Sequence, residues 1–135
     1  MKERRNFIRK LGGITALMAM GTTAKATETP TREQGPFFHV VFFWLINDSK
    51  EVKSSFEKEL RHFIEHVDEI RTSHIGTPAE TDRDVIDNTW SYSLVLSFDS
   101  KKEHDIYQDH SLHKRFIENA SSLWEKVLVY DSVKT

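Results

Sequence analysis

The chain has 135 residues, no cysteine and a formal net charge of −2 at pH 7 with neutral histidine. The absence of cysteine excludes disulfides, thiol catalysis and metal sites built from thiolates. A slightly acidic chain is also a poor partner for nucleic acid, because binding to phosphates relies on clustered Lys and Arg.

The first 26 residues show the three parts of an export signal in their usual order. A basic start contains Arg4 and Arg5, an apolar run covers residues 11–24, and Ala24-Lys25-Ala26 offers a cleavage site between small residues. The run is shorter than the about 20 residues that span a bilayer, so no stable membrane anchor is expected. Residues 1–26 are therefore predicted to direct export, to the periplasm or out of the cell.

The segment Arg4-Arg5-Asn6-Phe7-Ile8-Arg9 resembles the twin-arginine export motif. This resemblance implies that the protein folds before export, and the lack of cysteine agrees, since no disulfide awaits an oxidising compartment. The general export route and a basic N-terminus without an export role remain alternatives. Without residues 1–26, 13 basic and 20 acidic residues remain, a net charge of −7. Nucleic acid is therefore not expected as a partner.

Residues 27–36 are polar and contain Pro30, Gly35 and Pro36, which predicts a flexible linker. The following residues 37–46 read FFHVVFFWLI and are apolar at nearly every position. Such a run is typical of a strand that is buried on both faces. Asn47-Asp48-Ser49 ends this strand and offers caps for a helix.

The middle of the chain predicts a helix followed by two strands. Apolar residues recur at steps of three and four from Val52 to Ile70, which indicates one long helix with an apolar face. Residues 73–78 are expected to form a strand and residues 80–88 a charged loop. Residues 91–98 alternate in character, as a strand with one buried face does. Its apolar face consists of Tyr92, Leu94, Leu96 and Phe98.

The last third predicts a short helix over residues 101–108, a longer helix over residues 111–124 and a closing strand over residues 127–130. The element order is then βαββαβ, the ferredoxin-like α+β arrangement, with the second helix in two pieces. Helices cover only one face of such a sheet, whereas the first strand is apolar on both faces. A second copy of the sheet is therefore expected on the open face, in a symmetric homodimer.

A family resemblance rests on Tyr107-Gln108-Asp109-His110-Ser111-Leu112-His113 and on the segment from Leu123 to Asp131, LWEKVLVYD. These residues resemble the stress-responsive dimeric α/β-barrel (Dabb) family. Its usual pattern is a tyrosine, His-Pro-x-His, an apolar helix and a strand closing in Phe/Tyr-Asp. Ser111 stands where proline is usual. The resemblance covers residues 37–132 and implies that two sheets close into a dimeric barrel with a cavity in each subunit.

The resemblance also implies candidate catalytic residues. In family members that act as polyketide cyclases, the last histidine of the motif is the base and a tyrosine six positions earlier assists it; these positions are His113 and Tyr107 here. His113 would deprotonate a carbon next to a ketone, and Tyr107 would donate a hydrogen bond to the enolate oxygen before ring closure. The alternative is structural: His113 supports the helix start and Tyr107 is a buried aromatic residue.

Other polar side chains are expected around the same pocket. By the resemblance, the strand faces that carry His39 and Tyr92 point into the barrel. His110, one helical turn before the candidate base, is interpretable as a helix cap, a polar wall of the pocket or a metal ligand. A few polar groups in an apolar cavity are the usual composition of a small-molecule site, although each is also interpretable as a core residue. The predicted pocket residues are His39, Val41, Tyr92, Leu94 and His110.

No metal site and no cofactor are predicted. His62 and His66 are four residues apart on the first helix, a spacing that lets two imidazoles hold one metal ion. Both lie off the apolar face, and the sequence between them lacks the pattern of a zinc protease. A solvated helix surface is therefore the better interpretation.

Three functions remain as hypotheses. The first is an exported stress-responsive barrel protein whose pocket binds a small apolar or aromatic molecule. The second is a polyketide-cyclase-like or lyase-like enzyme that uses His113 as base and Tyr107 as hydrogen-bond donor. The third is a structural or stress-protective homodimer whose barrel is filled. In that case the barrel would be packed solidly by Phe43, Leu94, Phe116 and Trp124.

Overall fold

The computed structural model describes residues 36–135; the predicted export signal and nearly all of the predicted linker lie outside the described residues. Within this range no helix is both long enough and apolar enough to cross a membrane. The elements follow in the order β1 (Phe37–Leu45), α1 (Lys50–Ile64), β2 (Thr72–Gly76), β3 (Tyr92–Phe98), α2 (Lys101–Asp109), α3 (Ser111–Ala120), the 3₁₀ turn η1 (Ser121–Leu123) and β4 (Trp124–Val133).

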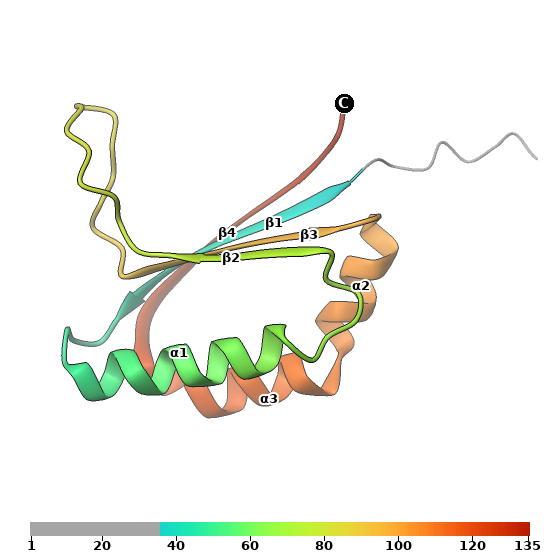
Figure 1. The fold of residues 1–135 in the computed structure, drawn as a ribbon, viewed down its shortest axis with the longest axis horizontal. Helices are drawn as coiled ribbons and strands as arrows, with labels where there is room; N and C mark the ends of the chain where they lie inside the picture. Colours follow the sequence, from blue (N-terminus) through green and yellow to red (C-terminus); the bar gives the residue numbers. More distant parts are fainter. Residues whose placement is uncertain (1–35) are drawn as a thin grey trace, which may run out of the picture. The chain divides into compact units, whose positions relative to one another are not determined.

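The four strands form one antiparallel sheet in the order β2-β3-β1-β4 (Figure 1). The predicted ferredoxin-like α+β fold is confirmed. The second helix is divided into α2 and α3 at His110, whose extended backbone ends the first piece and starts the second. The strand β1 pairs with β3 on one side and with the edge strand β4 on the other, so the first and last strands of the domain lie side by side.

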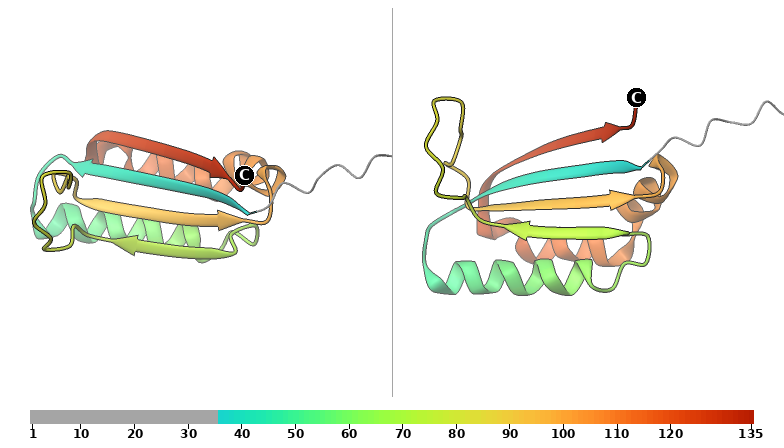
Figure 2. Two further views of the ribbon diagram at one scale, coloured as in Figure 1. Left: turned by 90° about the horizontal axis from the view of Figure 1, so that it is seen from above. Right: turned by 45° about the horizontal axis from the view of Figure 1, so that its top comes forward.

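The helices lie on one face of the sheet (Figure 2). α1 and α3 run side by side beneath it, and α2 crosses its end (Figure 1). Along β1 every second side chain faces these helices and is buried, as period-two alternation requires. The predicted apolar face of β3 is buried too. The core formed between the sheet and the helices includes Phe43, Phe56, Leu60, Phe63, Leu94, Leu96, Phe98, Phe116 and Ala120.

The opposite face of the sheet is covered by no helix among residues 36–135 (Figure 2). Apolar side chains nevertheless gather there: Phe38 and Tyr130 are 42% and 58% exposed, and Phe42 packs edge-on against Trp90 and Tyr130. β1 was expected to be buried on both faces, but within one chain only its helix-facing side is buried.

Several element boundaries differ from the sequence expectation, and the strand expected over residues 73–78 covers Thr72–Gly76. α1 ends at Ile64 and not at Ile70, because the His66 N–H donates to the Phe63 carbonyl in a tighter turn, at 3.3 Å. Val67 is still buried in this segment, so the apolar spacing continues along the chain beyond the last residue of the helix. α3 ends at Ala120 and β4 begins at Trp124, which lies in a strand and not in the expected helix.

Candidate functional site

A cavity of about 210 Å³ lies between the helix-facing side of the sheet and the helices. Four residues give it polar character: His39 from β1, Tyr107 and Gln108 from α2, and His113 from α3. The rest of the lining is apolar and comes from Val41, Phe43, Phe63, Leu94, Phe116, Ile117, Trp124, Val127 and Val129.

His113 lies in the first turn of α3, where its ring is half-buried against Phe63 and Tyr107. Its Nδ1 is 3.1 Å from the carbonyl oxygen of Gln108. Because a carbonyl only accepts, Nδ1 carries the proton, and in the neutral ring Nε2 keeps a free lone pair. Burial lowers the pKa of His113, although the hydrogen bond to Gln108 acts in the opposite direction. The ring is therefore neutral at pH 7, in the protonation state of a base.

Tyr107 lies beside His113, with 4.7 Å between the two ring centroids. This tyrosine belongs to α2, is 2% exposed and packs against Phe63 and Phe98. Burial, followed by the negative charge of Asp131, raises the pKa of Tyr107 well above its ordinary value. The phenol therefore stays protonated at all physiological pH values and is available as a hydrogen-bond donor.

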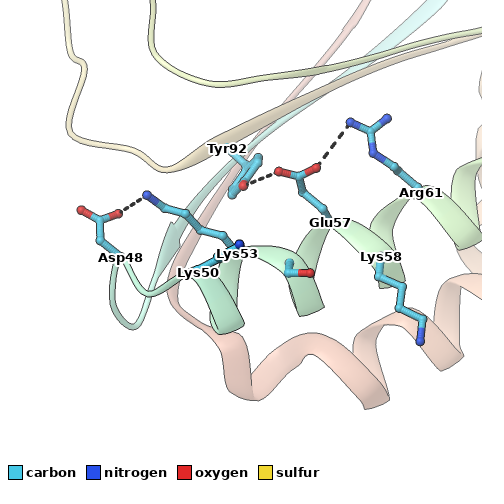
Figure 3. A pocket seen from close by; sticks show the side chains of 8 residues that line it. Asp48, Lys50, Lys53, Glu57, Lys58, Arg61 and Tyr92 are labelled. Atoms are coloured by element: carbon cyan, nitrogen blue, oxygen red, sulfur yellow. Dashed lines mark hydrogen bonds and ion pairs between the residues drawn. The ribbon is translucent and has the colours of Figure 1, made fainter.

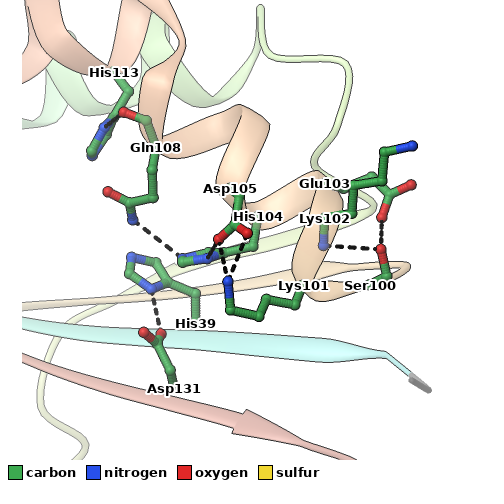
Figure 4. A network of polar contacts seen from close by, with 10 residues as sticks. All are labelled: His39, Ser100, Lys101, Lys102, Glu103, His104, Asp105, Gln108, His113 and Asp131. Atoms are coloured by element: carbon green, nitrogen blue, oxygen red, sulfur yellow. Dashed lines mark hydrogen bonds and ion pairs between the residues drawn. The ribbon is translucent and has the colours of Figure 1, made fainter. Parts of the chain in front are cut away.

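His39 is held by a carboxylate from the neighbouring strand. It pairs in register with Asp131 across β1 and β4, so both side chains lie on the helix side of the sheet. Nδ1 of His39 is 2.6 Å from Oδ1 of Asp131 (Figure 4). His39 is 5% exposed, whereas the side chain of Asp131 is 43% exposed. The pair thus joins a buried imidazole to a partly solvated carboxylate, and it fixes the orientation of the ring.

A second buried histidine, His104 of α2, lies next to this pair (Figure 4). The ring centroids of His104 and His39 are 5.0 Å apart, and His104 also stacks on Phe37 at 4.3 Å. Its Nε2 is 3.2 Å from the side-chain nitrogen of Gln108, which donates to it. Burial is the main cause that lowers the pKa of His104, and the nearby His39 adds to the effect.

The structure brings most of the predicted site residues together. His113, Tyr107, His39, Val41 and Leu94 all line the cavity. Two others lie elsewhere. The hydroxyl of Tyr92 donates to Oε1 of Glu57 at 2.6 Å in an open groove beside α1 (Figure 3), and Nδ1 of His110 accepts from the Leu112 N–H at 3.1 Å and so caps α3.

Sequence reasoning missed Asp131, His104 and Gln108. Asp131 belongs to the closing Tyr-Asp pattern, but its role depends on the pairing register of β1 and β4, which the sequence does not state. His104 and Gln108 carried a usable signal. His104 precedes Tyr107 by three residues and Gln108 by four, and this spacing places side chains on one face of a helix.

Comparison with known proteins agrees with this fold. Residues 37–134 match the model of the stress-responsive A/B barrel domain, Dabb. No curated protein matches the chain. Similar solved structures include a Dabb protein with a ferredoxin-like fold from Mesorhizobium loti, with 19% identity, a TM-score of 0.64, and coverage of 76% of this chain and 99% of that one.

Two further structures share the fold. A dimeric ferredoxin-like protein of unknown function from Bacteroides fragilis is 22% identical, with a TM-score of 0.57 and coverage of 73% of this chain and 96% of that one. A hydroxynitrile lyase from Passiflora edulis is 16% identical, with a TM-score of 0.62 and coverage of 76% and 95%. At these identities the likeness concerns the fold alone. The family model, by contrast, spans most of the chain, and the protein belongs to the stress-responsive α/β-barrel (Dabb) family.

Proposed function

We propose that this protein binds a small, largely apolar molecule in the cavity between the sheet and the helices. The observation that carries the proposal is the open space of about 210 Å³ among aromatic rings. Phe43, Phe116 and Trp124 contact one another at ring-centroid distances of 5.3 to 6.3 Å, yet they leave this space unfilled. A cavity of about 150 Å³ admits benzene, so the volume here suits a molecule with a single substituted ring.

The polar groups of the cavity favour a carbonyl compound as the ligand. Tyr107 is a permanent hydrogen-bond donor, and His113 presents an unprotonated Nε2. A carbonyl oxygen accepts from the first group, while an acidic C–H next to that carbonyl suits the second. An aromatic aldehyde or a methyl ketone with one ring matches the cavity in both size and polarity.

Proton-transfer catalysis is the second candidate function, and the hydrogen bond from His113 to Gln108 favours it. That bond fixes the tautomer, so Nε2 is the basic atom. In a cyclase-like or lyase-like reaction His113 would take the proton, and Tyr107 would stabilise the enolate or alkoxide oxygen. The hydroxynitrile lyase with the same fold supports the view that such a scaffold accommodates enzymes, but it assigns no role to any residue here.

Ligand binding is tested by thermal shift with a panel of single-ring aldehydes, ketones and phenols. A ligand present at 100 times its Kd stabilises the native state by about 2.7 kcal/mol, which raises the melting temperature. The variant Val129→Phe places a ring into the cavity lining and is expected to abolish this shift, while His66→Ala, on the surface of α1, retains it. If no compound distinguishes the native chain from Val129→Phe, ligand binding in the cavity is ruled out and the filled, protective homodimer becomes the favoured function.

Catalysis is tested on the ketones that bind. Exchange of their α-protons for deuterium is followed by NMR, because it reports proton abstraction without knowledge of the final product. The native chain is expected to accelerate exchange. His113→Gln should reduce this acceleration at least 100-fold, which is within the range that a positioned general base contributes. Tyr107→Phe should reduce it by a smaller factor. Equal exchange rates in the native chain and His113→Gln would leave a binding protein without this activity.

We also propose that the protein forms a homodimer through the open face of its sheet. Solved relatives are described as dimeric, and exposed apolar side chains such as Phe38, Leu128 and Tyr130 gather on that face. Burying them against a second copy is favourable in proportion to the apolar area removed from water. Light scattering on the full chain is expected to give twice the subunit mass of 15.8 kDa. A single subunit mass at micromolar concentration contradicts the proposal.

For the N-terminal segment we propose export. The support is the order of basic start, apolar run and small-residue cleavage site in residues 1–26. After cell fractionation, a chain shortened by about this segment is expected in the periplasm or the medium. Replacing Arg4 and Arg5 together by Lys should retain the chain in the cytoplasm if the twin-arginine route is used. Export of this double variant points to the general route, and a native chain that stays full-length in the cytoplasm refutes export.

A further inference from the structure

We propose that His39, His104 and Asp131 form a binding site for one divalent transition-metal ion at the end of the cavity nearest α2. Two imidazoles and one carboxylate offer ligand atoms that lie within 4.8 Å of one another (Figure 4). This donor set suits Zn²⁺ and Fe²⁺. The inference goes beyond the proposed ligand binding, and it neither requires nor implies that activity.

The three ligands come from three separate elements of the fold. The antiparallel register of β1 and β4 sets His39 opposite Asp131, on the side of the sheet that faces the helices. α2 crosses this end of the sheet and brings His104 over the pair, 5.0 Å from the ring of His39. Ligands supplied by strands and helices are held more firmly than ligands on loops, which favours a preformed site.

His104 has no part in the proton-transfer chemistry proposed above, because it does not line the cavity. It is nevertheless 7% exposed and surrounded by Phe37, Phe98 and Tyr107. A polar ring in such surroundings is costly unless its nitrogens find partners. Gln108 supplies one such partner, and an ion shared with His39 accounts for two buried imidazoles that lie together beside a carboxylate.

The neighbours of His104 resemble the outer hydrogen-bonding groups that orient metal ligands. The side-chain amide of Gln108 is 3.2 Å from Nε2 of His104, and Oδ1 of Asp105 is 3.8 Å from its Nδ1. If the ion takes the lone pair of Nε2, it displaces the Gln108 amide, and the N–H at Nδ1 then has the Asp105 carboxylate nearby as an acceptor. Such outer groups fix the ring orientation of a ligating histidine.

A small rearrangement completes the site. Metal–ligand bonds of about 2.0–2.2 Å hold two ligand atoms at most about 4.4 Å apart. Ligand atoms spread over 4.8 Å must therefore draw closer around an ion. The partly exposed side chain of Asp131 has room to turn toward it, and this movement replaces its hydrogen bond to Nδ1 of His39. Three protein ligands leave at least one coordination position open, as in catalytic and not in structural zinc sites. Since His39 also lines the cavity, this position adjoins its polar end.

His62 and His66 are the competing histidine pair. They lie four residues apart on α1 with ring centroids 4.8 Å apart, and both are exposed. Nδ1 of His66 is already 2.7 Å from the carbonyl oxygen of His62, and no carboxylate belongs to a cluster with them among residues 36–135. The pair is therefore the matched control for adventitious binding to surface imidazoles.

The test uses the full chain, stripped of metal with a chelator and titrated with Co²⁺ and then Zn²⁺. Visible absorption of Co²⁺ reports coordination by protein ligands, and calorimetry gives the Zn²⁺ stoichiometry and affinity. One ion per subunit is expected. His104→Leu and Asp131→Asn should each weaken Zn²⁺ binding at least tenfold, while the double variant His62→Ala/His66→Ala and the single variant His113→Ala retain it.

The inference is overturned if the native chain binds Zn²⁺ no more tightly than His104→Leu, or if only the double variant on α1 loses binding. Should His104→Leu fail to fold, Asp131→Asn decides, because its partly exposed side chain keeps its size. Thermal shifts by ring compounds are measured on the metal-free chain. If Zn²⁺ does not bind but the ring compounds still raise the melting temperature, only the metal site is refuted. If Zn²⁺ binds but no ring compound raises the melting temperature, only ligand binding is refuted.

Discussion

His113 and His39 show how single neighbours set the chemistry of an imidazole. In both rings an oxygen holds Nδ1: the Gln108 carbonyl for His113 and the Asp131 carboxylate for His39. Since an oxygen of this kind only accepts, Nδ1 carries a hydrogen in both rings, and Nε2 is the nitrogen that this bond leaves free. The two histidines therefore present the same edge, with Tyr107 packed against both.

Burial of His113 predicts a pH-dependent stability. Its pKa is lowered in the folded chain from the ordinary 6.5, so between the lowered value and 6.5 the unfolded chain binds a proton that the folded chain does not. The free energy of unfolding is therefore highest above about pH 6.5 and falls as the pH drops through this window. The melting temperature of His113→Gln is therefore expected to fall less between pH 7.5 and 5.5 than that of the native chain. The difference is at most the part of the fall that one proton taken up on unfolding causes.

His66→Gln is the control for this prediction, because it removes an exposed imidazole in place of a buried one. His104 is buried and shifted in the same direction, so some pH dependence remains in His113→Gln. The groups that face His113 are His39 and Tyr107 from neighbouring elements and His110 and Lys114 from its own. An unchanged pH profile in His113→Gln would show that the ring titrates alike in the folded and unfolded chains.

The sequence predicted the residues of the site that share one short segment or a recognisable pattern. Tyr107 and His113 were found because their six-residue spacing follows the family motif, and His39 because it shares a strand face with apolar residues. Asp131 and His104 were missed because their partner is His39, 92 and 65 positions away along the chain. A contact of this kind depends on strand register and on how α2 crosses the sheet, and neither is encoded in local spacing.

The junction between α2 and α3 offers a test of local backbone geometry. His110 has φ −63° and ψ 137°, the extended conformation that proline favours in the residue before it. Ser111, the first residue of α3, is exposed, and proline is favoured at this position because its N–H has no partner within the helix. Ser111→Pro is therefore expected to stabilise the protein by about 0.4–1 kcal/mol through the entropy of the unfolded chain. Thermal unfolding should show a rise of about 2–8 °C.

Ser121→Pro is the matched control at the other end of the same helix. Ser121 is exposed too, but its N–H donates to the Ile117 carbonyl, and Ala120 before it is helical with ψ −11°. Proline removes that hydrogen bond and disfavours the backbone of Ala120, so this variant should be destabilised by about 1–3 kcal/mol. Equal effects of proline at both sites would mean that the backbone at residue 110 differs from the extended form.

The boundaries of elements were predicted less well than their order, for a reason visible at the ends of α1 and α3. Val67 is buried in a turn after α1, so apolar spacing continues where helical hydrogen bonding has stopped. Trp124 keeps the helical spacing of α3 but pairs with Leu45, and a register shift between Trp44 and Leu45 admits it into the sheet. Periodicity reports which side chains are buried, whereas backbone pairing decides the element.

For the whole molecule, the open face of the sheet is exposed in a single subunit and would be buried in a face-to-face dimer. Leu128 on β4 pairs with Phe42 on β1, and both side chains point away from the helices. Leu128 is 37% exposed in one chain, so Leu128→Glu should leave the fold of the subunit intact. In a face-to-face dimer the same carboxylate would be buried without a partner, which is costly. We expect the dimer to dissociate at least about 100-fold more readily, a loss of about 2.8 kcal/mol.

Ile106→Glu is the control for this change, because Ile106 is similarly exposed, at 45%, but lies on α2 and not on the sheet. Sedimentation velocity over a range of concentrations should show a monomer for Leu128→Glu and a dimer for Ile106→Glu. The cavity is already present in the single subunit, between its sheet and its helices, so the monomeric variant should keep the thermal shift produced by ring compounds. A dimer that survives Leu128→Glu would place the interface elsewhere, and a monomer that no longer binds would mean that the second subunit completes the cavity.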